Sequence, residues 1–262
     1  MYHHPVFGAV VPEKGWVPAP RYLLRRHRIM KILRSLPRGE VLEIGCGAGA
    51  LSRDLSSMGF SVHAFDSSPA AREIAEYVNK DDSQVRIYSE EQQDWESRFD
   101  YLVALEVLEH IPDDHGTLRR WSSWLKPGGY LLLSVPCHPH RWNASDTWAG
   151  HMRRYERSGL HELLARFGFS VQHFECYGVP LANMIDPIRA RHHAKLLKQE
   201  EADAGPAKHT ARSGVERTLE SKLYYLQASW VGTKMIQVFC NVQGWFSNTE
   251  LGNGYLVLAQ RK

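Results

Sequence analysis

The chain has 262 residues, of which 43% are hydrophobic and 23% are charged, a balance that excludes a disordered or collagen-like chain. Its formal net charge of +3 is too small to favour nucleic acid as the main partner. No apolar run approaches the roughly 18 residues of a membrane span, and residues 1–5 lack the charged and apolar parts of a signal peptide. The four cysteines are widely spread and form no C-x-x-C pair, so we expect reduced thiols and a cytoplasmic protein.

The first 36 residues are expected to form an N-terminal unit ahead of the main domain. Residues 1–20 are rich in proline and glycine and indicate an extended segment, whereas residues 21–36 show the apolar spacing of a helix. The basic side chains of this helix form either a solvated face or a surface that meets phosphate or a membrane. These basic residues are Arg21, Arg25, Arg28, Lys31 and Arg34.

From residue 37 onward, short apolar runs alternate with amphipathic helical patterns. Strands that are apolar on both faces and alternate with helices are typical of a parallel sheet covered on each side. The sequence therefore predicts a doubly wound α/β fold. The expected strands are residues 41–44, 61–65, 85–88, 101–105, 130–135, 169–177 and 255–259.

The long connection between the last two strands is expected to form a helical cap. We assign residues 37–179 and 251–262 to the core and residues 180–250 to this inserted cap. Within the cap, residues 198–216 are polar, lack an apolar period and are predicted to be mobile. The aromatic residues of the cap either line an apolar acceptor site or form the core of the cap itself. They are Tyr224, Tyr225, Trp230, Trp245 and Phe246.

A glycine-rich turn follows the first strand of the core. Gly45, Gly47 and Gly49 let the backbone turn sharply and approach a ligand without Cβ clashes. Glu43 precedes them, and a carboxylate there suits a ligand with a cationic ammonium group and repels a pyrophosphate. Asp66 follows about 20 residues later, where an acid can accept hydrogen bonds from both ribose hydroxyls. A nucleoside that bears an amino-acid tail fits both acids, whereas a nicotinamide dinucleotide does not fit Glu43.

With these residues in place, the sequence resembles the class I S-adenosylmethionine-dependent methyltransferases. The segments that correspond in order to four motifs of that family are VLEIGCGAG (41–49), HAFDSSP (63–69), FDYLVALEVLEHI (99–111) and LKPGGYLLLSVP (125–136). The resemblance covers about residues 21–177 plus the final strand, and it implies a seven-stranded sheet whose last strand is antiparallel. It also implies that S-adenosylmethionine is the cofactor. The residues expected to contact it are Glu43, Gly45, Cys46, Gly47, Gly49, Asp66, Ser67 and Glu106.

The family often carries an acid after the third strand that binds the adenine amino group. In this chain the corresponding segment is Tyr-Ser-Glu-Glu at residues 88–91. Ser89 or Glu90 is the candidate for that contact, and a solvated turn is the alternative for either residue.

An E-x-x-E-H pattern follows the fourth strand. Spacings of three and four residues place Glu106, Glu109 and His110 on one helical face at the mouth of the site. Two carboxylates and an imidazole form a candidate site for a divalent cation such as Mg²⁺, Mn²⁺ or Zn²⁺. The same pattern occurs in metal-dependent small-RNA 2′-O-methyltransferases and in ubiquinone-biosynthesis O-methyltransferases, which add a histidine from the loop after the fifth strand. Here His151 is the matching candidate.

Two alternatives accompany the metal site. His138 and His140 compete with His151 as the additional ligand. The E-x-x-E-H pattern also occurs in methyltransferases without a metal, in which the first glutamate lines the cofactor pocket. In that case His110 or His151 is the candidate general base, and a hydrogen bond to a backbone carbonyl is the structural alternative for His151.

The loop of residues 137–155 contains the sequence GHMRRY and is the candidate acceptor-binding segment. Its two adjacent arginines suit a carboxylate or phosphate of the acceptor, because a guanidinium forms bidentate hydrogen bonds. They could equally pair with Asp146 or Glu156 and only fix the loop. The candidate acceptor-binding residues are Trp142, Arg153, Arg154 and Tyr155.

We therefore expect a methyltransferase that modifies an oxygen of a small or mid-sized metabolite, natural product or glycan-like acceptor. The first alternative is a metal-assisted 2′-O-methyltransferase of RNA termini, which the small net charge disfavours. The second is a non-catalytic subunit that binds the cofactor and regulates a partner.

Overall fold

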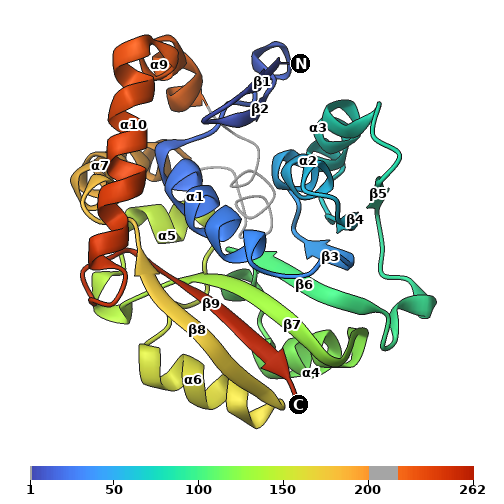
Figure 1. The fold of residues 1–262 in the computed structure, drawn as a ribbon. Coiled ribbons are helices and arrows are strands. Elements are labelled where there is room, and N and C mark those ends of the chain that lie inside the picture. The colour runs from blue at the N-terminus through green and yellow to red at the C-terminus, as the bar shows by residue number, and fades with distance from the viewer. Residues whose placement is uncertain (1, 201–217) are drawn as a thin grey trace.

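The protein is described by a computed structural model that covers residues 2–200 and 218–262. Seven strands form one sheet in the order β5-β4-β3-β6-β7-β9-β8 (Figure 1). The strands of this sheet are β3 (Glu40–Ile44), β4 (Ser61–Phe65), β5 (Val85–Tyr88), β6 (Phe99–Leu105), β7 (Leu125–Pro136), β8 (Phe169–Tyr177) and β9 (Gly254–Arg261). All seven lie where the sequence predicts them, with ends that differ by a few residues.

The direction of the strands agrees with the expected topology. The strands β3 to β7 pair in parallel, whereas the last strand, β9, lies antiparallel between β7 and β8. The chain enters the sheet at β3, extends it through β4 and β5, and then returns to the other side of β3 with β6. The strand order therefore reverses between β3 and β6, and open α/β sheets bind ligands outside the carboxyl ends of the strands at such a point.

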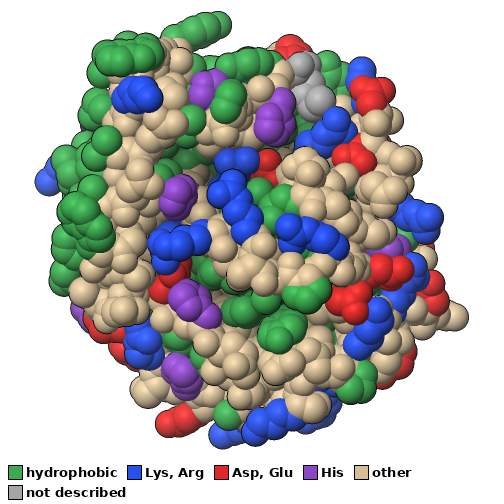
Figure 2. Space-filling model, viewed as in Figure 1, with side chains coloured by type: hydrophobic (Ala, Val, Ile, Leu, Met, Phe, Trp, Pro, Cys, Tyr) green, Lys and Arg blue, Asp and Glu red, His purple; other side chains and the backbone are tan. Residues whose placement is uncertain are grey.

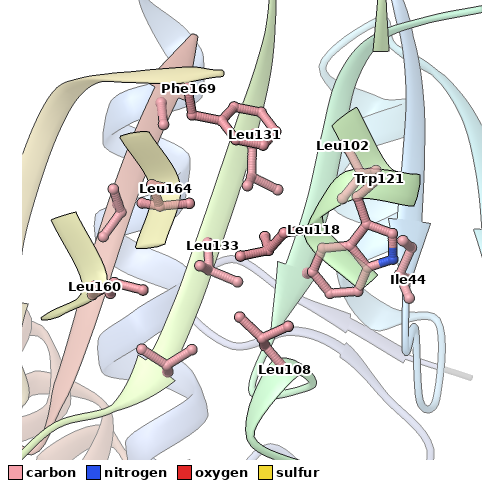
Figure 3. Packing of buried hydrophobic residues seen from close by; sticks show 14 of the residues in the cluster. Ile44, Leu102, Leu108, Leu118, Trp121, Leu131, Leu133, Leu160, Leu164 and Phe169 are labelled. Atoms are coloured by element: carbon pink, nitrogen blue, oxygen red, sulfur yellow. The ribbon is translucent and has the colours of Figure 1, made fainter. Parts of the chain in front are cut away.

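Helices cover both faces of the sheet. On one face, α4 and α6 pack against β3, β6 and β7 through a cluster that includes Leu118, Trp121, Leu133, Leu160 and Leu164 (Figure 3). On the other face, α1 and α2 pack through residues such as Ile29 and Leu55, and α3 lies beside α2. The bounds of these helices are α1 (Pro20–Arg34), α2 (Ala50–Ser57), α3 (Pro69–Asn79), α4 (Asp114–Trp124) and α6 (Arg157–Arg166).

In the described part of the connection between β8 and β9 there are three longer helices. They are α7 (Leu181–Glu200), α9 (Thr218–Ala228) and α10 (Trp230–Val242), followed by the 3-10 turn η5 (Gln243–Phe246). The helix α10 packs on α1, and α7 packs on the short helix α5 (Ala144–Ala149). Residues 198–200 of the segment predicted to be mobile end α7, and residues 201–216 lie outside the described residues. Within the described chain, we find no helix with the length and apolarity that crossing a membrane requires.

The N-terminal segment is more ordered than an extended lead-in. Its two strands, β1 (Tyr2–His4) and β2 (Gly8–Val10), pair antiparallel, and a 3-10 turn, η1 (Pro12–Lys14), follows. Phe7 and Val10 are fully buried against α1 and α10. The prediction of an extended segment was incomplete because this hairpin is stabilised by contacts with residues more than two hundred positions away.

The basic side chains of α1 do not form one solvated face, because Lys31 and Arg34 are exposed whereas the other three predicted residues are partly or fully buried. Arg28 donates two hydrogen bonds, of 2.8 and 2.6 Å, to the buried carboxylate of Glu175 on β8. Arg26 forms a similar two-fold pair with Asp54 on α2. The helix therefore uses its arginines to attach itself to the sheet and to α2, which the pattern of charges along one helix could not reveal.

Candidate active site

A cavity of about 640 Å³ opens at the carboxyl ends of β3, β4 and β6, where the strand order reverses. The segment that leads into α1 forms one wall of this cavity, and residues of α5 and α7 form another. A cavity of this volume is in the usual range for a site that binds an organic ligand.

The predicted glycine-rich turn lines this cavity. Gly45, Gly47 and Gly49 have positive φ angles of 68°, 55° and 67°; of the three, Gly45 and Gly47 lie on the cavity lining and Gly49 does not. A Cβ atom on Gly45 would lie 2.5 Å from Cγ2 of Val107, so this position has no room for a side chain. The buried Cys46 lies within the same turn and also lines the cavity. The turn thus exposes main-chain atoms to a ligand.

Glu43 lies at the end of β3 and is buried at the cavity. Ser52 donates a 2.5 Å hydrogen bond to its Oε2 atom, and no ion pair to Glu43 is found among the described residues. Burial raises the pKa of Glu43 to about 8. A buried acid without a cationic partner is the group expected opposite the ammonium of a ligand.

Asp66 follows β4 on the opposite side of the turn. One carboxylate oxygen accepts a 2.8 Å hydrogen bond from the amide of Gly47, and the other accepts a 2.9 Å bond from the amide of Ser68. These bonds hold the carboxylate in one orientation, with lone pairs left for a ligand. Ser67 lies beside it on the cavity lining.

Of the residues that follow β5, Glu91 lines the cavity, whereas Ser89 and Glu90 do not, although all three are exposed. Glu91 also lies 3.3 Å from a guanidinium nitrogen of Arg120 on α4. The sequence could not determine this register because the turn contains two adjacent glutamates.

Glu106 directly follows β6 and has a positive φ of 59°. Its carboxylate accepts a 3.0 Å hydrogen bond from Arg21 and lies 3.5 Å from Arg25, and it also accepts 3.0 Å bonds from Ser134 and Tyr177. Burial opposes its ionisation, but the two arginines outweigh burial and lower the pKa of Glu106 to about 2. The Glu106 side chain is therefore a carboxylate anion, and the protein itself supplies its ion-pair and hydrogen-bond partners.

The E-x-x-E-H pattern does not form a helical face. Residues 108–110 make a single 3-10 turn, η3 (Leu108–His110), and Glu106 lies outside it. Glu106 forms ion pairs with the arginines of α1 and is not part of the group of candidate metal ligands. This part of the predicted ligand set was wrong in geometry because the helical spacing rule was applied to a loop.

The other three predicted ligands do come together. One side-chain atom each from Glu109, His110 and His151 lies within 4.8 Å of the others. Glu109 is fully buried, and neither of its oxygens has a hydrogen-bond partner among the described residues. Burial, with a contribution from the nearby Glu106, raises the pKa of Glu109 well above its usual range. The competitors lie elsewhere, since His138 is grouped with Cys137 and Cys176, and His140 is exposed beside it.

Both histidines of this group are oriented through their Nδ1 atoms. Nδ1 of His151 lies 2.9 Å from Oδ1 of Asp146, and Nδ1 of His110 lies 3.3 Å from the carbonyl oxygen of Gly150. Because a carboxylate and a carbonyl only accept hydrogen bonds, each Nδ1 carries the proton and each Nε2 is free to bind. Metal-binding histidines in proteins are held in this way. The orphaned carboxylate and the two oriented imidazoles therefore fit a divalent cation.

The loop predicted to bind the acceptor is held by bonds to α4 and by bonds within the loop. Arg153 lies 2.7 Å from Asp114, and the hydroxyl of the buried Tyr155 donates to the same carboxylate. Arg154 forms a bidentate pair with Asp146 at 2.8 and 2.7 Å. Trp142 is exposed at the tip of η4 (Pro139–Arg141) and does not line the cavity. Of these four predicted acceptor contacts, only Arg154 lines the cavity, and it is already paired.

A family model described as a methyltransferase domain matches residues 20–174, which is more than half of the chain. The chain belongs to the class I S-adenosylmethionine-dependent methyltransferases. The matched region contains the glycine-rich turn, Asp66 and the Glu109–His110–His151 group. The helices α7, α9 and α10 lie beyond it, so the family model describes the cofactor side of the cavity and not the inserted helices.

A sequence relative agrees with this assignment, and solved structures share the fold. Ubiquinone biosynthesis O-methyltransferase of Xanthomonas campestris is 37% identical over 106 residues, which cover 38% of this chain and 44% of the relative. The chain thus spans less than half the length of the curated relatives it matches. The cyclase SpnF has a TM-score of 0.60 at 16% identity, covering 92% of this chain and 81% of its own. Phosphoethanolamine N-methyltransferase 2 of Haemonchus contortus, solved with S-adenosyl-L-methionine, has a TM-score of 0.54 at 18% identity, covering 90% and 52%.

Since one of these structures is a cyclase and the other an N-methyltransferase, the fold alone does not set the activity. Toward α5 and α7 the cavity contains residues to which the sequence analysis assigned no role. The rings of Trp148 on α5 and His193 on α7 stack with centroids 4.2 Å apart, and both line the cavity. Asp186 and Arg189 of α7 line it as well. No sequence signal joins α5 to α7, because they are brought together only by the fold.

Proposed function

We propose that this methyltransferase transfers the methyl group of S-adenosylmethionine to an oxygen atom of a small or mid-sized acceptor. The observation that carries the proposal is the buried Glu109 carboxylate with two oriented imidazoles, since His110 and His151 line the same cavity as Glu43 and Asp66. A hydroxyl is a weak nucleophile until it loses its proton, so a site that promotes deprotonation beside the cofactor favours an oxygen acceptor.

The chain's own groups account for the binding of the cofactor. Glu43 meets the ammonium of the methionine part, and Asp66 accepts hydrogen bonds from the ribose hydroxyls. The open main chain of Gly45 and Gly47 lets both parts approach closely. Glu91, in place of Ser89 or Glu90, is the acid that can reach the adenine.

The reaction is an in-line displacement. The acceptor oxygen attacks the methyl carbon, the carbon–sulfur bond breaks, and its electron pair stays on sulfur to give S-adenosylhomocysteine. Glu109, His110 and His151 would hold a divalent cation, which would supply a Lewis acid that lowers the pKa of an acceptor hydroxyl. Without a cation, Nε2 of His110 or His151 takes the hydroxyl proton directly, which makes that histidine a general base.

The acceptor lies toward α5 and α7. The stacked pair of Trp148 and His193 offers an aromatic surface there, and the relatives in ubiquinone biosynthesis are O-methyltransferases. We assign residues 37–179 and 251–262 to the cofactor-binding core. Residues 1–36 contribute Arg21 and Arg25 to the cavity, and α7 contributes Asp186, Arg189 and His193 to its acceptor side. Four free, buried cysteines support a reducing cytoplasmic location.

Transfer of a labelled methyl group from S-adenosylmethionine into a cell extract tests this function. Label in an extractable small molecule supports it, label in RNA supports the 2′-O-methyltransferase alternative, and no label supports a non-catalytic subunit. A parallel reaction with a chelator separates the two roles of the histidines. Loss of activity that Mn²⁺ restores indicates a bound cation, whereas unchanged activity indicates a general base.

A further inference from the structure

The helix α10 is apolar on two sides, and the described residues cover one of them. Ile236 and Cys240 are buried against Leu23 and Leu24 in the cluster that joins α10 to α1. The opposite side carries Val231, Met235 and Val238, spaced by four and three residues, and each is more than half exposed. A surface helix of a globular protein normally turns a polar face to water.

The exposed side of α10 continues into large aromatic residues at both of its ends. Trp230 at its start is 76% exposed, Trp245 beyond its end is 81% exposed, and Tyr225 at the end of α9 is 82% exposed. Figure 2 shows hydrophobic side chains gathered along the side of the molecule where α9 and α10 lie. We call this surface the α10 face. It comprises Tyr225, Leu226, Trp230, Val231, Met235, Val238 and Trp245.

The charged side chains of residues 221–249 are all positive. Residues 221–249 contain no aspartate or glutamate, and their charged residues are Lys222 and Lys234. Lys234 is exposed on α10 between Trp230 and Val238. A lysine in such a position can keep its ammonium in water while its stem lies on an apolar surface. The α10 face therefore suits a partner that is apolar with anionic groups at its edge.

We propose that the α10 face binds the surface of an anionic lipid membrane, with α10 lying in the plane of the interface. Tryptophan and tyrosine are enriched at the level of lipid headgroups, and here they flank an aliphatic centre. A second copy of the chain is the less suitable partner. Its α10 face would bring lysine against lysine with no acid to pair with either.

Flotation of the purified full-length protein with lipid vesicles tests this proposal. We expect binding to vesicles of phosphatidylcholine with phosphatidylglycerol, and weaker binding to phosphatidylcholine alone. The double variant Trp230→Ser/Val238→Ser loses about tenfold or more in vesicle affinity, because two apolar side chains are removed from the interface. Lys234→Glu loses about fivefold or more on the anionic vesicles only. All three substitutions are at exposed positions, so thermal melting should be unchanged.

Matched controls lie away from this surface. Trp142→Ser removes another exposed tryptophan, and Lys80→Glu reverses another exposed lysine, so both should bind vesicles as the wild type does. Vesicle binding that is absent, or that the α10-face variants leave unchanged, overturns the proposal. A wild-type dimer in sedimentation that Trp230→Ser/Val238→Ser converts to a monomer also overturns it, since the face would then join two copies. The assay uses no cofactor or acceptor, so its outcome is independent of the proposed methyl transfer.

Discussion

The imidazole of His151 places its Nε2 atom 3.8 Å from the fully buried carboxylate of Glu109. Neither oxygen of that carboxylate has a hydrogen-bond partner among the described residues. A buried polar group without a partner is destabilising by about 1–3 kcal/mol, and more if it is charged. A site that retains such a group next to two oriented imidazoles is better explained by a ligand than by packing.

The first prediction concerns this group. Titration with Mn²⁺ in a calorimeter should give saturable binding to the wild type. Glu109→Gln should weaken that binding by about tenfold or more, because it removes the anionic ligand. The same variant should bind S-adenosylhomocysteine with unchanged affinity, since Glu109 does not line the cavity.

Glu90→Gln is the control for the first prediction, because Glu90 is exposed and lies off the cavity. Equal Mn²⁺ affinity in the wild type and in Glu109→Gln would show that Glu109 is not a ligand.

The second prediction concerns the buried acid that faces the glycine-rich turn. Glu43→Gln keeps the shape of the side chain and prevents its ionisation opposite the ligand's ammonium, so the affinity for S-adenosylhomocysteine should fall by about tenfold to a hundredfold. The variant should be at least as stable as the wild type when no ligand is present, because burial already opposes the charge of Glu43. Isothermal calorimetry and thermal melting measure the two effects.

If Glu43→Gln binds S-adenosylhomocysteine as tightly as the wild type does, then Glu43 does not contact the cofactor. Glu90→Gln is again the control, with no change expected in either measurement.

The cofactor half of the site could be predicted from the sequence because its residues lie close together along the chain. Glu43, the three glycines and Asp66 all lie at the ends of adjacent parallel strands, and the rule that such ends share one edge brings them together. The strand pattern itself was readable because buried parallel strands are apolar on both faces.

The remainder of the site depends on contacts between distant segments. Arg21 and Arg25 reach Glu106 from a helix some eighty residues earlier, and Tyr177 reaches it from β8. The sequence shows that Arg21 and Arg25 are four residues apart and share one side of a helix, but it does not show that this side faces Glu106. The Arg154–Asp146 pair was one of two readings left open, and the bidentate geometry favours the structural one.

The third prediction concerns Glu175 and the pH dependence of stability. Burial alone would raise the pKa of this carboxyl, but hydrogen bonds from Arg28 and His173 lower it below the ordinary value of 4.5. A carboxyl with a lowered pKa in the folded state contributes stability above pH 4.5, and that stability is lost as the pH falls through the folded-state pKa. At neutral pH, Glu175→Gln should lower the free energy of unfolding by about 1–3 kcal/mol.

Urea unfolding of the wild type and of Glu175→Gln at pH values from neutral to acid measures this contribution. The difference between the two proteins should shrink below pH 4.5, because the wild type then loses the charge that the variant lacks. Glu162→Gln on the exposed side of α6 is the control, with a change within about 0.5 kcal/mol at every pH. A difference that stays constant with pH would mean that the Glu175 charge does not contribute.

The fourth prediction concerns the close approach of Gly45 to Val107. Gly45→Ala places a Cβ atom 2.5 Å from Cγ2 of Val107 at a φ of 68°, a region that side chains rarely adopt. We expect the free energy of unfolding to fall by about 1–3 kcal/mol and the affinity for S-adenosylhomocysteine to fall with it. The double variant Gly45→Ala/Val107→Ala should recover only part of the loss, because it removes the clash and leaves the backbone strain.

Gly159→Ala separates these effects from the simple addition of a methyl group. Gly159 lies in α6 with no atom within 4 Å of the added Cβ and no positive φ, so this substitution should stabilise the protein by up to about 1 kcal/mol. If Gly45→Ala has the melting temperature and the S-adenosylhomocysteine affinity of the wild type, then the turn tolerates a side chain at this position. Glycine at position 45 would then not be required for the approach of the cofactor. A full recovery in the double variant would instead assign the whole effect to the contact with Val107 and none to the left-handed backbone.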